Sequence, residues 1–286
     1  MKIGIGPYYM KEYGVAEGAK RMHRHGYEYL DFGFYSKTDN RLYPADEAEF
    51  IRVAEGWRDA LVQNGYRVHQ IHGPWQWPIT DGTEEGRAER FEKMSKALLG
   101  ASIIGARYMA IHPIMPFGIE KHTEEEERLL WEMNVEYYSR LAKIGERYGV
   151  YVCLENMPFP DFPISSAIDI MKLVKMINHP YVRVCLDTGH ANVVKPDPAE
   201  SVKIIGKEYL KILHVHGNDG KDDRHFTPRQ EGDTVNWEAF SAALREISFD
   251  GVVSLETEPC TGDATDPERE EIEITLANIA KGIAGI

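Results

Sequence analysis

Six short apolar runs in this sequence each end in a residue type that can bind a metal ion. The runs are Val68–His72, Tyr108–His112, Tyr151–Glu155, Val182–Asp187, Ile212–His216 and Val252–Glu256. A buried strand that ends in His, Asp or Glu presents that group at the edge of the core, and the ends of successive parallel strands converge on one spot. The sequence therefore predicts a metal site built from strand ends.

The last four of these ends supply three carboxylates and one imidazole: Glu155, Asp187, His216 and Glu256. This set suits a divalent ion such as Mn²⁺, Mg²⁺, Co²⁺ or Zn²⁺. Any one of these residues alone could instead serve a structural hydrogen bond, but four at equivalent strand ends favour metal binding. We expect the four side chains to share one ion.

Two neighbouring patterns add imidazoles to this region. His190 follows Asp187 by one helical turn, and His214 lies on the same face of its strand as His216 because side chains alternate along a strand. His216 is nearer the rim and is the predicted ligand. His214 could equally be an orienting or a core histidine.

A second metal position is predicted from more distant residues. Asp223 and His225 lie two residues apart in a polar loop, and could join His190, with His72 and His112 on the opposite side of the first ion. The alternative is a solvated polar loop without a role. Arg224 could hold an anion or a hydroxyl group, and Trp75 offers a flat face to a sugar.

Eight β-rich runs alternate with helical segments, which favours one (β/α)₈ TIM barrel over residues 1–286. The runs are Lys2–Gly6, Tyr29–Phe34, Arg67–Gly73, Arg107–His112, Val150–Asn156, Val182–Thr188, Lys211–Gly217 and Gly251–Thr257. The helical segments are Val15–His25, Asp46–Asn64, Glu84–Ile104, Thr123–Tyr148, Ser166–Ile177, Pro198–Ile205, Trp237–Ile247 and Pro267–Ile283. Long loops with Pro, Gly and aromatic residues follow the strands, which places the active face at their carboxyl ends.

The composition excludes several classes of protein. The formal net charge of -13 argues against nucleic acid as the main ligand, because phosphate binding normally needs a basic face. No signal peptide and no run of about 18 apolar residues is present, so we expect no membrane association. Two of the three cysteines lie in strand-like runs, which favours core thiols and a reducing cytoplasm.

The chain resembles the xylose isomerase-like TIM-barrel superfamily over its whole length. The motifs that carry the resemblance are Leu154-Glu155-Asn156, Leu186-Asp187-Thr188-Gly189-His190, His214-Val215-His216-Gly217-Asn218-Asp219 and Leu255-Glu256. In ketose 3-epimerases of that group the counterparts of Glu155, Asp187, His216 and Glu256 hold one divalent ion. The resemblance implies that Glu155 and Glu256 form the acid/base pair, and that His190 and Arg224 contact substrate hydroxyls. Those enzymes usually carry Glu where this chain has Asp161 and Asp219.

Endonuclease IV, with three zinc ions, belongs to the same superfamily, and its ligand pattern also fits this chain. The matching positions are His72, His112, Glu155, Asp187, His190, His216, Asp223, His225 and Glu256. The segment Gly6-Pro7-Tyr8-Tyr9 at the end of the first strand and the acidic charge differ from that nuclease. The resemblance therefore implies a sugar or sugar-phosphate isomerase or epimerase of carbohydrate metabolism. Two other functions stay open: a zinc-dependent phosphodiesterase and a non-catalytic sugar-binding barrel. The chain could also form a homo-oligomer.

Overall fold

Eight parallel strands form the centre of the molecule. The computed structural model describes residues 1–33 and 42–286. The strands are β1 (Lys2–Ile5), β2 (Tyr29–Phe32), β3 (Val68–His72), β4 (Tyr108–Ile111), β5 (Tyr151–Glu155), β6 (Val182–Asp187), β7 (Leu210–His214) and β8 (Val252–Leu255). Strands β1 to β7 pair with one another in sequence order, and β1 also pairs with β8. Backbone hydrogen bonds between Val215 and the end of β8 join the two edges, so the sheet closes into a single (β/α)₈ TIM barrel.

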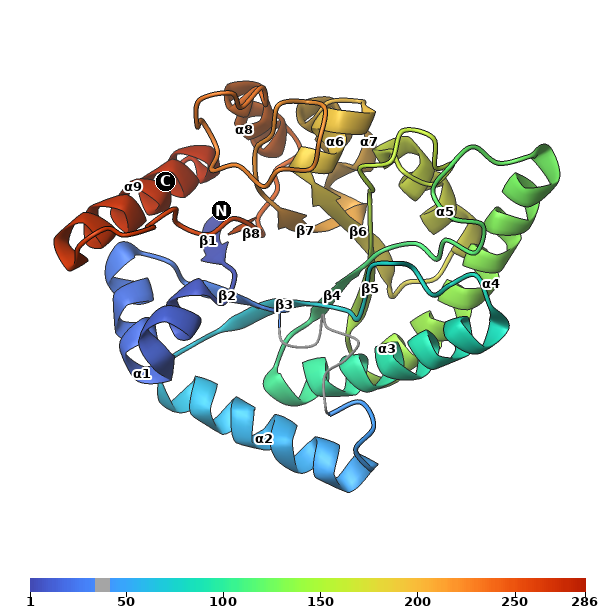
Figure 1. The fold of residues 1–286 in the computed structure, drawn as a ribbon, viewed down its shortest axis with the longest axis horizontal. Helices are drawn as coiled ribbons and strands as arrows, with labels where there is room; N and C mark the ends of the chain where they lie inside the picture. Colours follow the sequence, from blue (N-terminus) through green and yellow to red (C-terminus); the bar gives the residue numbers. More distant parts are fainter. Residues whose placement is uncertain (34–41) are drawn as a thin grey trace.

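Helices surround the barrel in an outer layer (Figure 1). They are α1 (Tyr8–His25), α2 (Glu47–Gln63), α3 (Glu84–Ile104), α4 (Glu124–Tyr148), α5 (Ala167–Ile177), α6 (Thr188–Val194), α7 (Pro198–Tyr209), α8 (Trp237–Glu246) and α9 (Asp266–Ala284). Thr123 and Ser166 begin α4 and α5 with capping boxes, which satisfy amide groups left free at a helix start. None of the helices in residues 1–33 and 42–286 is long and apolar enough to span a membrane.

Two predicted boundaries are wrong. The sequence predicts that the first helix begins at Val15, but α1 begins at Tyr8 and is kinked at Gly14, and Tyr8 and Tyr9 are buried. The short helix α6 directly follows β6, where the sequence predicts no helix. Its capping residue is Asp187, which accepts a hydrogen bond from the backbone amide of His190.

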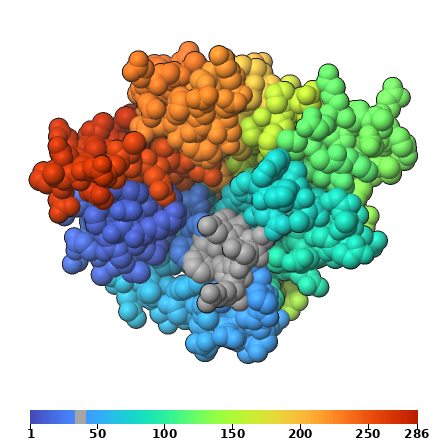
Figure 2. Space-filling view, in the orientation of Figure 1, coloured from blue at the N-terminus to red at the C-terminus, as the bar shows by residue number. Residues whose placement is uncertain are grey.

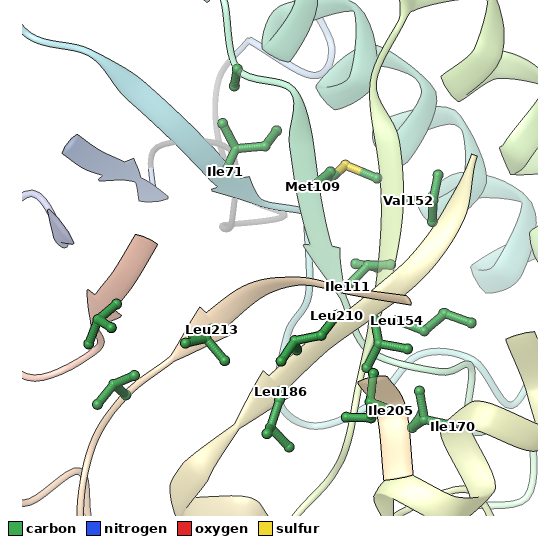
Figure 3. Packing of buried hydrophobic residues seen from close by; sticks show 14 of the residues in the cluster. Ile71, Met109, Ile111, Val152, Leu154, Ile170, Leu186, Ile205, Leu210 and Leu213 are labelled. Atoms are coloured by element: carbon green, nitrogen blue, oxygen red, sulfur yellow. The ribbon is translucent and has the colours of Figure 1, made fainter. Parts of the chain in front are cut away.

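The alternation of side chains along the strands divides the core into two parts. Between the barrel and the helices lie apolar side chains such as Ile111, Leu154 and Leu213, which pack with Ile170 of α5 and Ile205 of α7 (Figure 3). A separate cluster inside the barrel is made of apolar residues from four neighbouring strands: Ala110, Cys153, Cys185 and Ile212. Side chains two positions further along each strand point the same way and are polar.

The two ends of the chain lie side by side, as the adjacent blue and red surfaces in Figure 2 show. Glu273 of α9 is fully buried, and its carboxylate accepts hydrogen bonds from the hydroxyls of Tyr8 and Tyr13 and from Arg21 of α1. A buried carboxylate is stable only with such partners. This cluster therefore fixes the last helix against the first and keeps the barrel closed.

Candidate metal centre

The polar side chains inside the barrel lie at the carboxyl ends of the strands. His112, Glu155, Asp187 and His214 each follow a member of the small interior cluster by two residues and so point in the same direction. Below them Gln70 donates a hydrogen bond to Asp31 over 2.8 Å. The barrel is thus packed in its lower part and carries a set of titratable side chains at the carboxyl ends of its strands.

The first group of candidate ligands is His72, His112 and Glu155, all of them buried. The Nε2 atoms of the two histidines are 3.3 Å apart. Each lies 3.5 Å from Oε2 of Glu155, and that oxygen accepts no hydrogen bond. The three atoms therefore face one another closely enough for one metal ion to bind all of them.

The second group joins Glu155 to Asp187, His214 and Glu256, with ligand atoms that all lie within 4.8 Å of one another. Nδ1 of His214 is 2.8 Å from Oε1 of Glu155 and 3.1 Å from Oε2 of Glu256. Glu155 is thus shared between the first and second groups, one oxygen facing each. A carboxylate in that position can bridge two sites.

The third group lies on the other side of Asp187. Nε2 of His216 is 2.9 Å from Oδ2 of Asp187 and 3.7 Å from Oδ1 of Asp223. Oδ2 of Asp223 lies 3.2 Å from Nε2 of His190 and 3.3 Å from Nε2 of His225. The loop that carries Asp223 and His225 therefore folds over the strand ends rather than away from them.

Backbone carbonyl groups orient most of these imidazoles. Nδ1 of His72 lies 2.6 Å from the carbonyl oxygen of Gly73, Nδ1 of His190 lies 2.7 Å from that of Asn156, and Nδ1 of His225 lies 2.9 Å from that of Glu256. A carbonyl can only accept, so Nδ1 must carry the proton and Nε2 is left to face the carboxylates. This orientation is typical of histidines that bind metal ions through Nε2.

Glycine at position 189 makes room for one of these rings. A Cβ atom added to Gly189 would lie 2.1 Å from Cε1 of His216, closer than any two unbonded carbon atoms can approach. The ring of His216 also stacks on that of His225, with centroids 3.9 Å apart and planes 5° from parallel. The position of His216 therefore depends on a residue without a side chain in the neighbouring helix.

The carboxyl groups of the centre differ in their affinity for protons. Burial opposes ionisation of Glu155, but the charge and hydrogen bond of His214 and the proximity of His112 and His72 hold its pKa well below the usual range. Burial raises the pKa of Glu256, and repulsion from Glu155 adds to the rise against the attraction of His214. The two carboxyl groups are thus shifted in opposite directions.

The histidines are shifted as well. Burial opposes protonation of His190, but Asp187 and Asp223 outweigh it and raise its pKa to about 10. Burial likewise opposes protonation of His225, while Asp223 and Glu256 raise its pKa to about 9. Burial lowers the pKa of His112 to about 4. In the absence of a metal ion, protons on His190 and His225 would thus neutralise the carboxylates.

These donors fit a divalent cation. The imidazole nitrogens left without a proton face carboxylate oxygens, and such pairs repel unless a proton or a cation lies between them. The oxygen of Glu155 without a hydrogen bond is buried among two of these nitrogens. Nitrogen and carboxylate oxygen together are the ligands of Zn²⁺, Mn²⁺ and Co²⁺ more than of Ca²⁺.

Comparison with known proteins agrees with this architecture. The model of the family described as xylose isomerase-like TIM barrel matches residues 19–278. The chain belongs to this family. Its members share the barrel, and the family resemblance deduced from the strand-end motifs is confirmed.

Individual members of the xylose isomerase-like family differ in their activities. A D-psicose 3-epimerase from Ruminiclostridium cellulolyticum is 32% identical over 127 residues, 44% of this chain and 41% of that protein. A probable endonuclease 4 from Mycoplasmoides gallisepticum is 24% identical over 170 residues, 54% of this chain and 53% of that protein. A solved structure of an IolI protein with a bound zinc atom has a TM-score of 0.72 at 18% identity, covering 100% of this chain and 98% of that one.

The predicted residues of this family member divide into two sets. Nine of them meet at the strand ends: His72, His112, Glu155, Asp187, His190, His216, Asp223, His225 and Glu256. The other predicted residues lie further out. Arg224 pairs with Asp222 at 3.0 Å, and Asp161 is exposed, 3.9 Å from Lys121. Trp75 lies beside the centre, its ring centroid 5.1 Å from that of His112.

The sequence predicts His216 as the ligand from this strand and leaves His214 as an orienting or a core histidine. Strand β7 ends at His214, and His214 is the imidazole that contacts both Glu155 and Glu256. The motif His214-Val215-His216 already contained the signal, since both rings point the same way from the strand. Which of the two meets Glu155 depends on the stagger between β6 and β7, where Asp187 is in register with His214.

Proposed function

We propose that this protein is a divalent-metal-dependent isomerase or epimerase that acts on a sugar, a sugar phosphate or a related polyol. The observation that carries the proposal is the pair Glu155 and Glu256, two carboxyl groups within 3.1 Å of the same nitrogen of His214 in a buried cluster of metal ligands. Two carboxyl groups with pKa values shifted apart suit the removal and the return of a proton.

The residues of the chain divide the work as follows. Glu155, Asp187 and Glu256, with His216 or His214, would hold the ion. When bound, such an ion polarises a substrate carbonyl and acidifies the neighbouring C–H group. Glu155, with the lowered pKa, would accept that proton, and Glu256, with the raised pKa, would return one. His214 contacts both carboxyl groups and would hold them at a fixed separation.

Two further findings support the proposal. The relative from Ruminiclostridium cellulolyticum is named as a D-psicose 3-epimerase, which is an isomerisation chemistry of this kind. The structural neighbour that holds zinc has the same barrel. The packed site at the carboxyl ends of the strands is also the usual place of catalysis in such barrels.

A zinc-dependent phosphodiesterase of the endonuclease IV kind is the second candidate. The observation that favours it is the position of Asp223, whose carboxylate approaches both His190 and His225 and so completes a third group of ligands. Two or three adjacent ions stabilise the attacking and leaving oxygens of a phosphodiester. The net charge of -13 opposes it, because DNA binding requires basic residues that neutralise phosphates.

One experiment separates the two candidates. The protein is purified without added metal, its metal content is measured by elemental analysis, and it is assayed with aldoses, ketoses, their phosphates and abasic-site DNA. We expect turnover of at least one sugar and no DNA cleavage above the buffer control. Cleavage of the DNA at a rate similar to that of any sugar turnover, with three ions per chain, would overturn the isomerase proposal. Binding of sugars without turnover would indicate a non-catalytic barrel.

A further inference from the structure

A cleft with exposed aromatic walls lies beside the metal centre. Trp75 and Trp77 come from the loop after β3 and Phe159 comes from the loop after β5, and all three line the cleft. The side chains of Trp75 and Trp77 are 42% and 61% exposed. The rings of Trp77 and Phe159 are 6.3 Å apart and 29° from parallel. Such exposure of tryptophan is costly in water and marks a binding surface.

The cleft is continuous with the metal centre. His112 and Pro113 form its inner end. The ring of Trp75 lies 5.1 Å from the ring of His112, whose Nε2 is 3.5 Å from Glu155. A molecule that reacts beside Glu155 can therefore extend across Trp75 toward Trp77 without leaving the surface of the protein.

The wall of the cleft is rigid near the centre. The guanidinium group of Arg90 is buried, pairs with Asp81 at 2.5 Å and donates a hydrogen bond to the carbonyl oxygen of His112 at 3.0 Å. Asp81 also accepts a hydrogen bond from the backbone amide of Met115. These bonds connect the loop before α3 to the end of β4, so the aromatic residues of that loop are held in place.

The outer part of the cleft is polar. Thr80, Glu89 and Lys93 line it, and Nζ of Lys93 lies 2.6 Å from Oε1 of Glu89. Flat aromatic faces beside hydroxyl, carboxylate and ammonium groups match a sugar ring, which has apolar C–H faces and a rim of hydroxyls. A purely apolar ligand would leave these polar groups without partners.

We propose that this cleft is a subsite for a second sugar ring, so that the substrate is a disaccharide or a longer saccharide rather than a free monosaccharide. The inference rests on the proposed function, because it places the reacting ring at the metal centre. The second ring would then stack on Trp77 and Phe159, with its hydroxyls toward Thr80, Glu89 and Lys93.

The test measures binding separately from turnover. The metal-loaded protein is titrated by calorimetry with glucose, cellobiose, maltose and phenyl β-glucoside, and sugar turnover is assayed in parallel. We expect at least one disaccharide to bind about tenfold more tightly than glucose. One stacking contact with an aromatic ring, together with the area it buries, supplies a binding free energy of about this size. Equal affinities would overturn the subsite. Tighter binding of phenyl β-glucoside than of both disaccharides would also overturn it, because an aromatic group would then be the preferred occupant.

Variants of the aromatic residues test whether the preference for disaccharides arises in this cleft. Trp77→Ala and Phe159→Ala should each weaken disaccharide binding by about fivefold to tenfold, with a smaller loss for glucose. Phe117→Ala is the control, because Phe117 is 37% exposed on the loop after β4 but does not line the cleft. An equal loss in all three variants would count against the subsite.

The outcomes distinguish the two proposals. If disaccharides bind preferentially through Trp77 but no sugar is turned over, the subsite holds and the isomerase proposal fails. If free monosaccharides are turned over and no variant changes the preference, the isomerase proposal holds and the subsite fails.

Discussion

Nδ1 of His214 lies 2.8 Å from Oε1 of Glu155, and the same nitrogen lies 3.1 Å from Oε2 of Glu256. On its other edge, Nε2 of His214 is 3.5 Å from Oδ2 of Asp31, a carboxylate of the second strand. One imidazole thus lies between carboxyl groups from three strands on different sides of the barrel. Removing it would leave buried negative charges without a partner.

The first prediction concerns this histidine. His214→Ala should lower the free energy of unfolding of the metal-free protein by about 3 kcal/mol, the lower end for breaking a buried ion pair, because Glu256 is partly exposed. Urea unfolding measures the change. His179→Ala is the control, since His179 pairs at 3.7 Å with a Glu146 that is largely exposed, and should cost less than about 1 kcal/mol. Equal losses would mean that His214 is only a packing residue.

The second prediction concerns metal removal. A tightly bound ion present at 100 times its Kd adds about 2.7 kcal/mol of stability. Removing it with a chelator should therefore lower Tm by about 5–10 °C, and adding Mn²⁺, Co²⁺ or Zn²⁺ should restore it. Thermal unfolding with and without the chelator gives the shift.

The control for metal removal is Asp187→Asn. Asp187 belongs to two of the ligand groups, so this variant should lose most of the response to metal. A wild-type Tm that does not change with chelator and metal would contradict the metal centre.

The third prediction concerns the acid/base pair. Glu155→Gln and Glu256→Gln keep the shape of each side chain but remove its ability to exchange a proton, and should each lower turnover by at least ~10²-fold. Reaction in deuterium oxide should place deuterium on the carbon next to the carbonyl. Product without deuterium at that carbon would indicate a hydride shift, and the two glutamates would then act as metal ligands alone.

The fourth prediction concerns Gly189. Gly189→Ala places a Cβ atom 2.1 Å from the ring of His216, so the ring must move. We expect a loss of about 1–3 kcal/mol in stability, as in other overpacked sites, together with a lower metal content. Gly282→Ala in α9 is the control, because its Cβ atom would contact nothing within 4 Å, and should change stability by no more than about 1 kcal/mol. Similar results for both variants would show that His216 tolerates displacement.

The amino-acid sequence was sufficient to predict the barrel fold and the residue types that gather at the strand ends. The predicted strands are apolar for most of their length, and six of them lead into His, Asp or Glu. Strands of this kind separated by helices can bury their faces only in a parallel sheet covered by helices. The alternation of side chains along a strand also determines which residues face the interior, so that Cys153 lies below Glu155 and Cys185 below Asp187.

The tertiary structure decided which of these side chains meet. His214 and His216 point the same way from one strand, and only the stagger between β6 and β7 sets His214 beside Glu155 and His216 beside Asp187. Asp223 and His225 belong to a loop whose path depends on contacts with residues far away in the sequence, including the carbonyl of Glu256. A local pattern carries no information about such contacts, because they arise only when the barrel closes and brings distant loops to the same face.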